Sequence, residues 1–231
     1  MSKASRAIRA DGEVTRARII EAAGELVAAR GFAQTPSKVI ALRAEVDLAS
    51  INYHFGGRDG LYQVVLAEAH RRLIALPDLG RVAQAEAPAE EKLRSLIEFL
   101  VTRTLQSQSW HARVLAREIL SPSPQLRSLL EEEIAPKFVI VRRLLGEITG
   151  LPEDHPALLR CILNIGAPCA VLLVSGSELP GPFKPVLNSS RAELVEHLHT
   201  FALAGLKAIG RQHAEREAVR SSTRRKAKDS M

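Results

Sequence analysis

The sequence predicts an all-α protein in which a small N-terminal helical domain precedes a larger helical domain. Apolar residues recur every three or four positions through most of the 231-residue chain, as they do along one face of a helix. Aromatic residues make up only 4% of the chain, so the core must rest on aliphatic side chains and alanine, which suit packed helices. No stretch after residue 88 alternates apolar and polar residues with the period of two that marks a half-buried strand.

The first predicted helix runs from about residue 13 to residue 30. Gly31 is a suitable stop, because glycine adopts the left-handed conformation at a helix end without steric cost. The preceding residues 1–11 are polar and basic, and we expect them to form a flexible arm. The apolar face of this helix consists of Ile19, Ala22, Ala23, Leu26 and Val27.

Two short helices are predicted next, over residues 36–43 and 48–55. Thr35 and Asp47 each precede one of them, and both residue types cap helix N-termini with a side-chain oxygen. Pro36 suits a first helical turn, where its missing N–H group is not needed. The segment therefore has the start signals of two consecutive helices joined by a tight turn.

The second of these short helices has only two turns and would not be stable in water alone. We expect Ile51 and Phe55 to hold it, because residues four apart lie on the same helix face. Two short helices of this kind, the second with a polar outer face, suit the major groove of DNA. The residues left on or beside that outer face are Leu48, Ala49, Ser50, Asn52, Tyr53 and His54.

Residues 12–75 resemble the TetR/AcrR family of transcriptional repressors. The resemblance rests on the opening TPSKVIA from Thr35 to Ala41, on the Tyr53-His54-Phe55 ending, and on a basic residue then leucine at Arg58 and Leu61. The motif INYHFG at residues 51–56 is similar to the corresponding motif of one subgroup of that family. The stretch AREILSPSP at residues 116–124 is more loosely similar to the CecR-like ligand domain of the same subgroup.

The resemblance implies a three-helix helix-turn-helix DNA-binding domain joined by a fourth helix to a larger ligand-binding and dimerisation domain. It implies a homodimeric repressor in the bacterial cytoplasm, released from a pseudo-palindromic DNA operator by a small-molecule effector. Hydroxyl and basic groups would position the protein on phosphates, and Asn or small apolar groups would meet base edges. The implied DNA contacts are Thr35, Ser37 and Lys38 from the second helix, Leu48, Ala49, Ser50, Asn52, Tyr53 and His54 from the third, and Arg58 from the fourth.

Several of these assignments have structural alternatives. Leu48 could belong to the core, Tyr53 could pack within the domain, and His54 could simply end the helix in solvent. Glu45 departs from the family, which usually has glycine in the turn. A non-glycine residue with positive φ costs about 1–2 kcal/mol. Either Glu45 bears that strain or the turn differs.

The sequence pattern divides the chain after the N-terminal arm into four predicted segments. The DNA-binding domain covers 12–76, its fourth helix spanning 58–76, and Pro77 opens a linker over 77–88. The ligand-binding and dimerisation domain covers 89–213. The last segment, 214–231, is rich in Arg and Lys without apolar periodicity, and we expect it to be disordered.

Two sites in the larger domain are expected from the resemblance. The effector pocket has as its candidate lining residues Phe99, Arg103, Trp110, His111, Arg117, Phe138 and Cys169, each with ordinary core or surface placement as its alternative. The last two long helices would pair with their copies in a dimer. The corresponding stripe, whose alternative is intrachain core, consists of Leu194, Leu198, Phe201, Ala202, Gly205 and Ile209.

The charge distribution fits either a polyanionic partner at the chain ends or an ordinary solvated surface. Residues 1–75 carry eleven basic and eight acidic residues, residues 214–231 carry six and three, and the middle is balanced. No apolar run approaches the roughly 20 residues that span a membrane, so no membrane partner is expected. Cys161 and Cys169 would lie about 12 Å apart along one helix, too far for a disulfide bond.

No catalytic or metal-binding motif stands out. The chain has no HExxH, no CxxC and no recognisable nucleophile setting, so we expect no enzymatic activity, metal or cofactor. A helical scaffold protein that does not bind DNA remains the alternative to a regulator.

Overall fold

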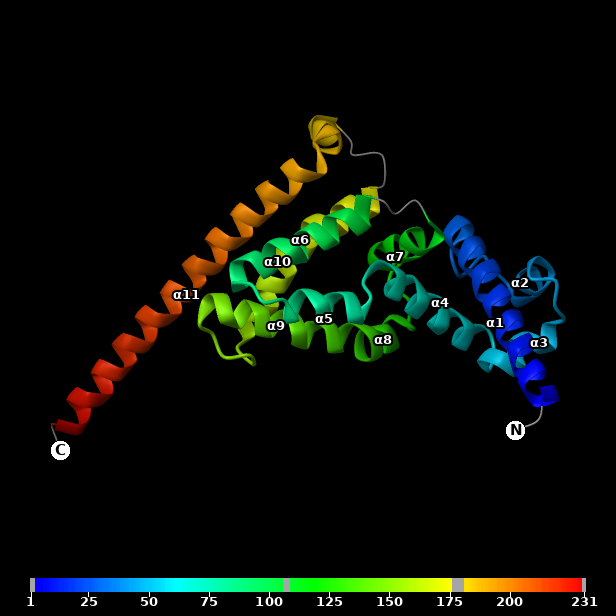
Figure 1. Ribbon diagram of the computed structural model, residues 1–231, viewed down its shortest axis with the longest axis horizontal. Helices are drawn as coiled ribbons and strands as arrows, with labels where there is room; N and C mark the ends of the chain where they lie inside the picture. The colour runs from blue at the N-terminus through cyan, green and yellow to red at the C-terminus, as the bar shows by residue number, and fades with distance from the viewer. Residues whose placement is uncertain (1–2, 106–108, 176–180, 230–231) are drawn as a thin grey trace. The chain divides into compact units, whose positions relative to one another are not determined.

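The computed structural model describes residues 3–105, 109–175 and 181–229 (Figure 1). Within these ranges every regular element is a helix, which confirms the predicted all-α class. Contacts divide the chain into two compact units. Unit 1 comprises residues 1–75, 104–135 and 173–176, and unit 2 comprises residues 76–103, 136–172 and 177–231.

Unit 1 begins with four helices that carry the predicted helix-turn-helix. They are α1 (Lys3–Arg30), α2 (Ser37–Arg43), α3 (Leu48–Phe55) and α4 (Arg58–Leu73). Helix α1 contacts α2 and α4, and α3 contacts both α2 and α4. The expected flexible arm is wrong from Lys3 onward, because α1 already starts there. Ala, Arg and Lys are good helix formers, so local propensity extends the helix beyond its apolar face.

Three further elements lie wholly within unit 1. They are α7 (Trp110–Leu120), α8 (Leu126–Leu129) and the π-helix η1 (Leu130–Ile134). Trp110 is buried against α1, where a Cβ on Gly24 would come within 2.4 Å of the indole ring. The Trp110 Nε1–H donates a 2.8 Å hydrogen bond to Glu21. These contacts place α7 with the N-terminal helices, and α8 and η1 contact α4. The sequence pattern places all three elements in the domain 89–213.

Unit 2 contains the remaining helices. They are α5 (Leu76–Gln84), most of α6 (Ala89–Leu105), α9 (Ala135–Thr149), most of α10 (Pro156–Ser175), the 3₁₀-helix η2 (Gly181–Asn188) and α11 (Arg191–Asp229). The predicted linker at 77–88 is wrong in its first part, which forms α5. Pro77 does not follow α4 directly but occupies the first turn of α5, where a proline costs no hydrogen bond.

Helix α11 continues far beyond its packed part. It runs to Asp229 as one helix (Figure 1), so the expected disorder of 214–231 is wrong for 214–229. Residues 214–222 are all exposed, so this part of the extension has no core face. Its Ala, Glu, Arg and Lys residues favour the helix locally, and Arg220 pairs with Glu217 at 3.1 Å.

Helix α10 is more apolar than the sequence analysis allowed. By length and composition alone it could cross a membrane, with a mean hydropathy of 2.0, so the claim that no run approaches spanning length is wrong. A core helix passes the same test, and α10 supplies much of the core of unit 2. Cys161 and Cys169 are both buried there without a disulfide. Burial raises the pKa of both thiols, that of Cys169 to about 11.

Candidate nucleic-acid interface

Helix α3 is closed at both ends by its own sequence. The Asp47 Oδ1 accepts hydrogen bonds from the Ser50 N–H at 2.8 Å and the Ser50 hydroxyl at 3.2 Å, which confirms the predicted N-cap. Gly56 ends the helix at φ 70°. Four residues later, a Cβ on Gly60 would lie 2.0 Å from the Phe55 carbonyl oxygen. Only glycine therefore allows α4 to approach the end of α3 this closely.

The two α3 residues that were predicted to pack inward, Ile51 and Phe55, do so. Ile51 is 1% exposed, and Phe55 packs partly buried against the same core. The other side of the helix faces outward. Tyr53 is 85% exposed and Leu48 49% exposed, so neither belongs to the core. Ala49 and Asn52 are also exposed, while Ser50 and His54 are half-buried.

Helix α2 contributes fewer available residues than expected. Lys38 is exposed and Ser37 half-buried, but Thr35 is only 1% exposed. The Thr35 hydroxyl donates a 2.8 Å hydrogen bond to the Gly31 carbonyl at the end of α1. Pro36, without a side-chain hydrogen bond, is the N-cap of α2. Thr35 is therefore neither the predicted cap nor an accessible DNA contact, because its side chain stabilises the loop after α1.

Arg58 is also engaged inside the domain. Its Nε–H donates to the Thr35 carbonyl at 3.1 Å, and its Nη2 donates to the Phe32 carbonyl. Its guanidinium carbon lies 4.1 Å from the centre of the Phe32 ring. The predicted phosphate contact from Arg58 is thus not supported, since this side chain is half-buried and fixes the loop between α1 and α2 onto α4.

The turn between α2 and α3 keeps the helix-turn-helix path despite Glu45. Glu45 adopts φ 55°, and it alone among the non-glycine residues of the described chain has a positive φ. The Val46 N–H still donates to the Ala41 carbonyl at 3.0 Å. Of the two alternatives for this turn, the structure therefore has the one in which Glu45 bears the strain of a positive φ. The Glu45 side chain is exposed to solvent.

The exposed surface of α2 and α3 has the chemistry of a DNA reader. A lysine and hydroxyl groups can position the protein on phosphates, and an amide, a phenol and small apolar groups can meet base edges. The surface is supported from behind by α1, whose Arg16 guanidinium lies 5.4 Å from the centre of the Phe55 ring. The residues that reach it are Ser37, Lys38, Leu48, Ala49, Ser50, Asn52, Tyr53 and His54.

Three of the seven predicted pocket residues lie in unit 1 and have structural partners. Trp110 packs on α1, and the His111 ring stacks on the Trp110 ring at 3.7 Å. Burial lowers the pKa of His111. Arg117 donates to the carbonyls of Ala28 at 2.9 Å and Ala29 at 3.0 Å. These carbonyls at the end of α1 lack helical partners, so Arg117 acts as a cap that the sequence analysis missed.

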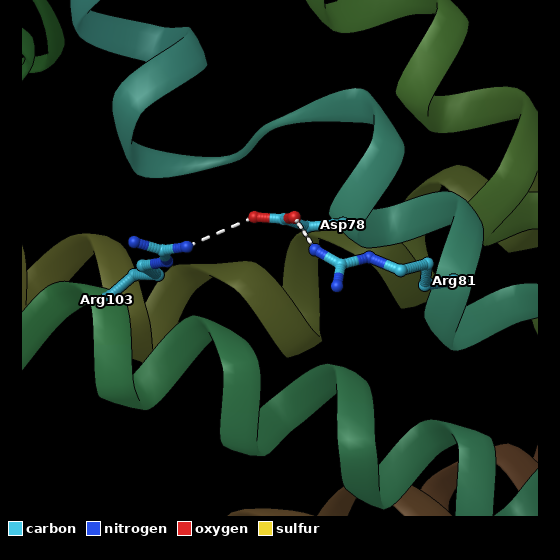
Figure 2. Close-up of polar contacts among 3 residues, drawn as sticks. All are labelled: Asp78, Arg81 and Arg103. Carbon is cyan, nitrogen blue, oxygen red and sulfur yellow. Dashed lines mark hydrogen bonds and ion pairs between the residues drawn. The ribbon is translucent and has the colours of Figure 1, made fainter.

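The other four predicted pocket residues lie in unit 2. Figure 2 shows Arg81 of α5 and Arg103 of α6 converging on the two carboxylate oxygens of Asp78, with Arg103 at 3.1 Å. Phe99 lies under the Arg103 guanidinium at 5.5 Å from the ring centre. Phe138 is 37% exposed and Cys169 is buried. Neither unit brings the seven predicted residues together around one cavity.

The residues of the predicted dimer stripe on α11 do not share one environment, because some face the core of unit 2 and others face solvent. Four of its residues pack partly buried against the core of unit 2, namely Leu194, Leu198, Ala202 and Ile209. Phe201 is 75% exposed, and Gly205 is exposed beside it. Helix α10 has an exposed apolar side that was not predicted from the sequence. Leu159, Leu163 and Val171 are 45%, 68% and 54% exposed and follow one another at helical spacing, a signal that the uniformly apolar composition of α10 hid.

Comparison with known proteins agrees with this architecture. The family model described as bacterial regulatory proteins, tetR family, matches residues 19–65. The model described as the C-terminal domain of the HTH-type transcriptional dual regulator CecR matches residues 89–206.

A curated relative, the HTH-type transcriptional repressor Rv3405c of Mycobacterium tuberculosis (strain H37Rv), is 34% identical over 112 residues. The matched segment covers 48% of this chain and 50% of the relative, so the chain spans about half the length of the curated relatives it matches.

Solved structures show the same fold at lower identity. The fatty acid degradation regulator FadR from Bacillus halodurans aligns with a TM-score of 0.62 at 19% identity, covering 84% of this chain and 96% of that one. A TetR-like transcriptional regulator from Rhodococcus sp. RHA1 aligns with a TM-score of 0.58 at 16% identity, covering 83% and 95%. The two family models together account for both the helix-turn-helix and the larger helical part. The chain belongs to the TetR family of bacterial transcriptional regulators, with a C-terminal domain of the CecR type.

Proposed function

We propose that this protein is a sequence-specific DNA-binding transcriptional regulator, acting as a repressor. The observation that carries the proposal is α3, a helix capped by Asp47, anchored by Ile51 and exposing Tyr53 on its outer side. A short helix presented in this way suits the major groove. The predicted DNA contacts that remain are Ser37, Lys38, Leu48, Ala49, Ser50, Asn52, Tyr53 and His54.

The active form in this proposal is a homodimer. The exposed apolar side of α10 and the exposed Phe201 of α11 both lie in unit 2, and exposed apolar residues that gather on one surface are the usual mark of a protein interface. Two copies related by a twofold axis would present two α3 helices to a pseudo-palindromic operator.

A small-molecule effector would release the operator by binding one of the two dimer conformations more tightly than the other. We also propose that INYHFG at residues 51–56 marks a subgroup of the family. The protein would act in the bacterial cytoplasm, without catalysis and without a membrane. The second candidate function is a helical scaffold that does not bind DNA.

The proposal is tested by selecting DNA fragments with the purified protein and measuring gel shifts of the selected sequence. We expect a palindromic motif, bound about 10³-fold or more tightly than random DNA, with affinity that falls steeply as salt rises. The double variant Tyr53→Ala/His54→Ala should lose this specific binding while its helical content and oligomeric state stay unchanged.

Leu120→Ala serves as the matched control, because Leu120 is a 70% exposed apolar residue at the end of α7 and belongs to neither α2 nor α3. It should bind as the parent does. If the double variant still shifts the selected DNA like the parent, α3 is not the reading helix. If the selection enriches no sequence at all, the scaffold function is favoured.

A further inference from the structure

Unit 1 contains a cavity that none of the predicted pocket residues line. It measures about 150 Å³ and lies between α1, one face of α4, and α8 with η1. Its lining residues are Arg16, Gln63, Val64, Ala67, Arg71, Ser128, Leu129, Glu132 and Glu133. A cavity of about 150 Å³ is large enough to hold a benzene ring.

The lining of this cavity combines apolar surface with satisfied polar groups. Val64, Ala67 and Leu129 supply the apolar part. The Gln63 Nε2–H donates to the Ser128 hydroxyl at 3.3 Å, which links α4 to α8. Arg71 of α4 pairs with Glu133 of η1, with its Nε at 2.8 Å from the carboxylate. These polar groups pair with each other. The apolar part of the lining therefore remains available to contact the apolar part of a ligand.

Two charges of opposite sign remain at the cavity. Arg16 of α1 faces the Phe55 ring but has no carboxylate partner among the residues that the structure describes. Glu132 of η1 likewise has no cationic partner within the described ranges. Both side chains are exposed at the surface. They come from different helices that flank α4, so one cation and one anion are available to the same bound molecule.

We propose that this cavity binds a small zwitterion with an apolar body, a molecule of the size and chemistry of an apolar amino acid. Its carboxylate would pair with Arg16, its ammonium group with Glu132, and its side chain would lie on Val64 and Ala67. A simple carboxylate would gain the first pair but face the Glu132 charge, and a simple amine would face Arg16. A ligand with both charges can pair with both residues.

The position of the cavity makes it an effector site for the proposed DNA reader, and this part rests on the proposed function. The Arg16 guanidinium contacts the ring of Phe55, the last residue of α3. Residues of α4 line the same cavity as Arg16. A ligand that draws the Arg16 guanidinium off the Phe55 ring removes a contact at the end of the reading helix. Ligand binding should therefore weaken operator binding.

The test uses three probes with the same phenyl ring: L-phenylalanine, 3-phenylpropionate and phenethylamine. Isothermal titration calorimetry of the full chain without DNA should detect L-phenylalanine, with either singly charged probe binding about tenfold or more weakly. Ala67→Leu fills the cavity and should abolish binding. Arg16→Gln and Glu132→Gln should each weaken it about tenfold or more.

Matched controls lie next to both charged residues. Arg18→Gln removes an exposed arginine of α1, and Glu131→Gln removes a carboxylate that pairs with Arg127 rather than facing the cavity. Both should bind L-phenylalanine as the parent does. Circular dichroism of every variant checks that loss of binding is not loss of folding.

The site is overturned if no heat accompanies any probe, if Ala67→Leu binds like the parent, or if 3-phenylpropionate binds as tightly as L-phenylalanine. The effector role is measured separately, as the affinity for the selected operator with and without saturating L-phenylalanine. Unchanged affinity overturns that role. If no operator is found at all, the proposed function fails while the calorimetric result still decides the site.

Discussion

The Tyr62 hydroxyl donates a 2.8 Å hydrogen bond to the Glu118 carboxylate and thereby ties α4 to α7 inside unit 1. Glu118 is only 3% exposed, and it also accepts from the Ser123 N–H and hydroxyl, both at 2.7 Å. These donors compensate the burial of a charge. The Tyr62 ring in turn stacks on Phe32 at 4.1 Å, in the loop before α2. One series of contacts therefore runs from α7 to the start of the helix-turn-helix.

Removing the Tyr62 hydroxyl should destabilise the protein. Tyr62→Phe keeps the ring stacked on Phe32 but takes a donor from a buried carboxylate, at a cost of about 1–3 kcal/mol in the free energy of unfolding. Urea denaturation measures this difference. The chain offers a matched control in its only other tyrosine, Tyr53, which is 85% exposed, so Tyr53→Phe should leave stability unchanged. Equal stability of both variants would show that the hydrogen bond contributes nothing.

Glycine at position 45 should stabilise the protein. Glu45 sits at φ 55°, where a Cβ is strained by about 1–2 kcal/mol. Part of the gain is offset because glycine loses more backbone entropy on folding, so Glu45→Gly should raise the free energy of unfolding by about 0.5–1 kcal/mol. Glu45→Ala removes the same carboxylate but keeps the Cβ. A stabilisation shared equally by the alanine variant would trace to the lost charge and not to the backbone.

His111 should make the protein less stable in mild acid. Burial lowers the pKa of His111; the nearby Arg72 lowers it further, while Glu21 and Glu68 oppose the shift. The unfolded chain then binds the proton more readily than the folded one, so the stability contribution is present above the ordinary histidine pKa of about 6.5 and is lost as pH falls below it.

The melting temperature of the parent should therefore drop more between about pH 7 and pH 5 than that of His111→Gln. His197→Gln, at an exposed position of α11, provides the comparison and should follow the parent. A His111→Gln variant that loses as much melting temperature as the parent would exclude His111 as the cause.

A charge at Phe201 should break the proposed dimer. Phe201 is 75% exposed on α11, and its replacement by glutamate would leave an unpaired charge in an apolar interface. Sedimentation velocity should show Phe201→Glu as a monomer at concentrations where the parent is a dimer. Leu120→Glu, which places the same charge at a 70% exposed apolar position of α7, should remain dimeric. Retention of the dimer by Phe201→Glu would move the interface elsewhere.

Helix α3 was predictable from the sequence because its signals are local. Asp47 caps it, Gly56 ends it, and Ile51 and Phe55 recur at helical spacing, so the predicted bounds 48–55 equal those observed. The positive φ of Glu45 was foreseen as one of two outcomes for the same reason, since a tight turn constrains its own backbone.

Thr35 and Arg58 were not predictable in the same way. Both residue types bind phosphate readily, and the family resemblance pointed to that role. Their actual partners are Gly31 for Thr35, and Thr35 and Phe32 for Arg58. The Arg58 partners lie more than twenty positions away in the chain, a separation that no local pattern encodes.

The sequence by itself determined the all-helical class, the bounds and N-cap of α3 and the face of α3 that is left exposed, because these depend on side-chain type and on spacing within a few residues. Tertiary structure decided which polar side chains form hydrogen bonds within the protein, that α7 packs with the N-terminal helices, and where a cavity remains. These outcomes depend on contacts such as Tyr62 with Glu118, between residues 56 positions apart, and distance along the chain carries no information about such pairs.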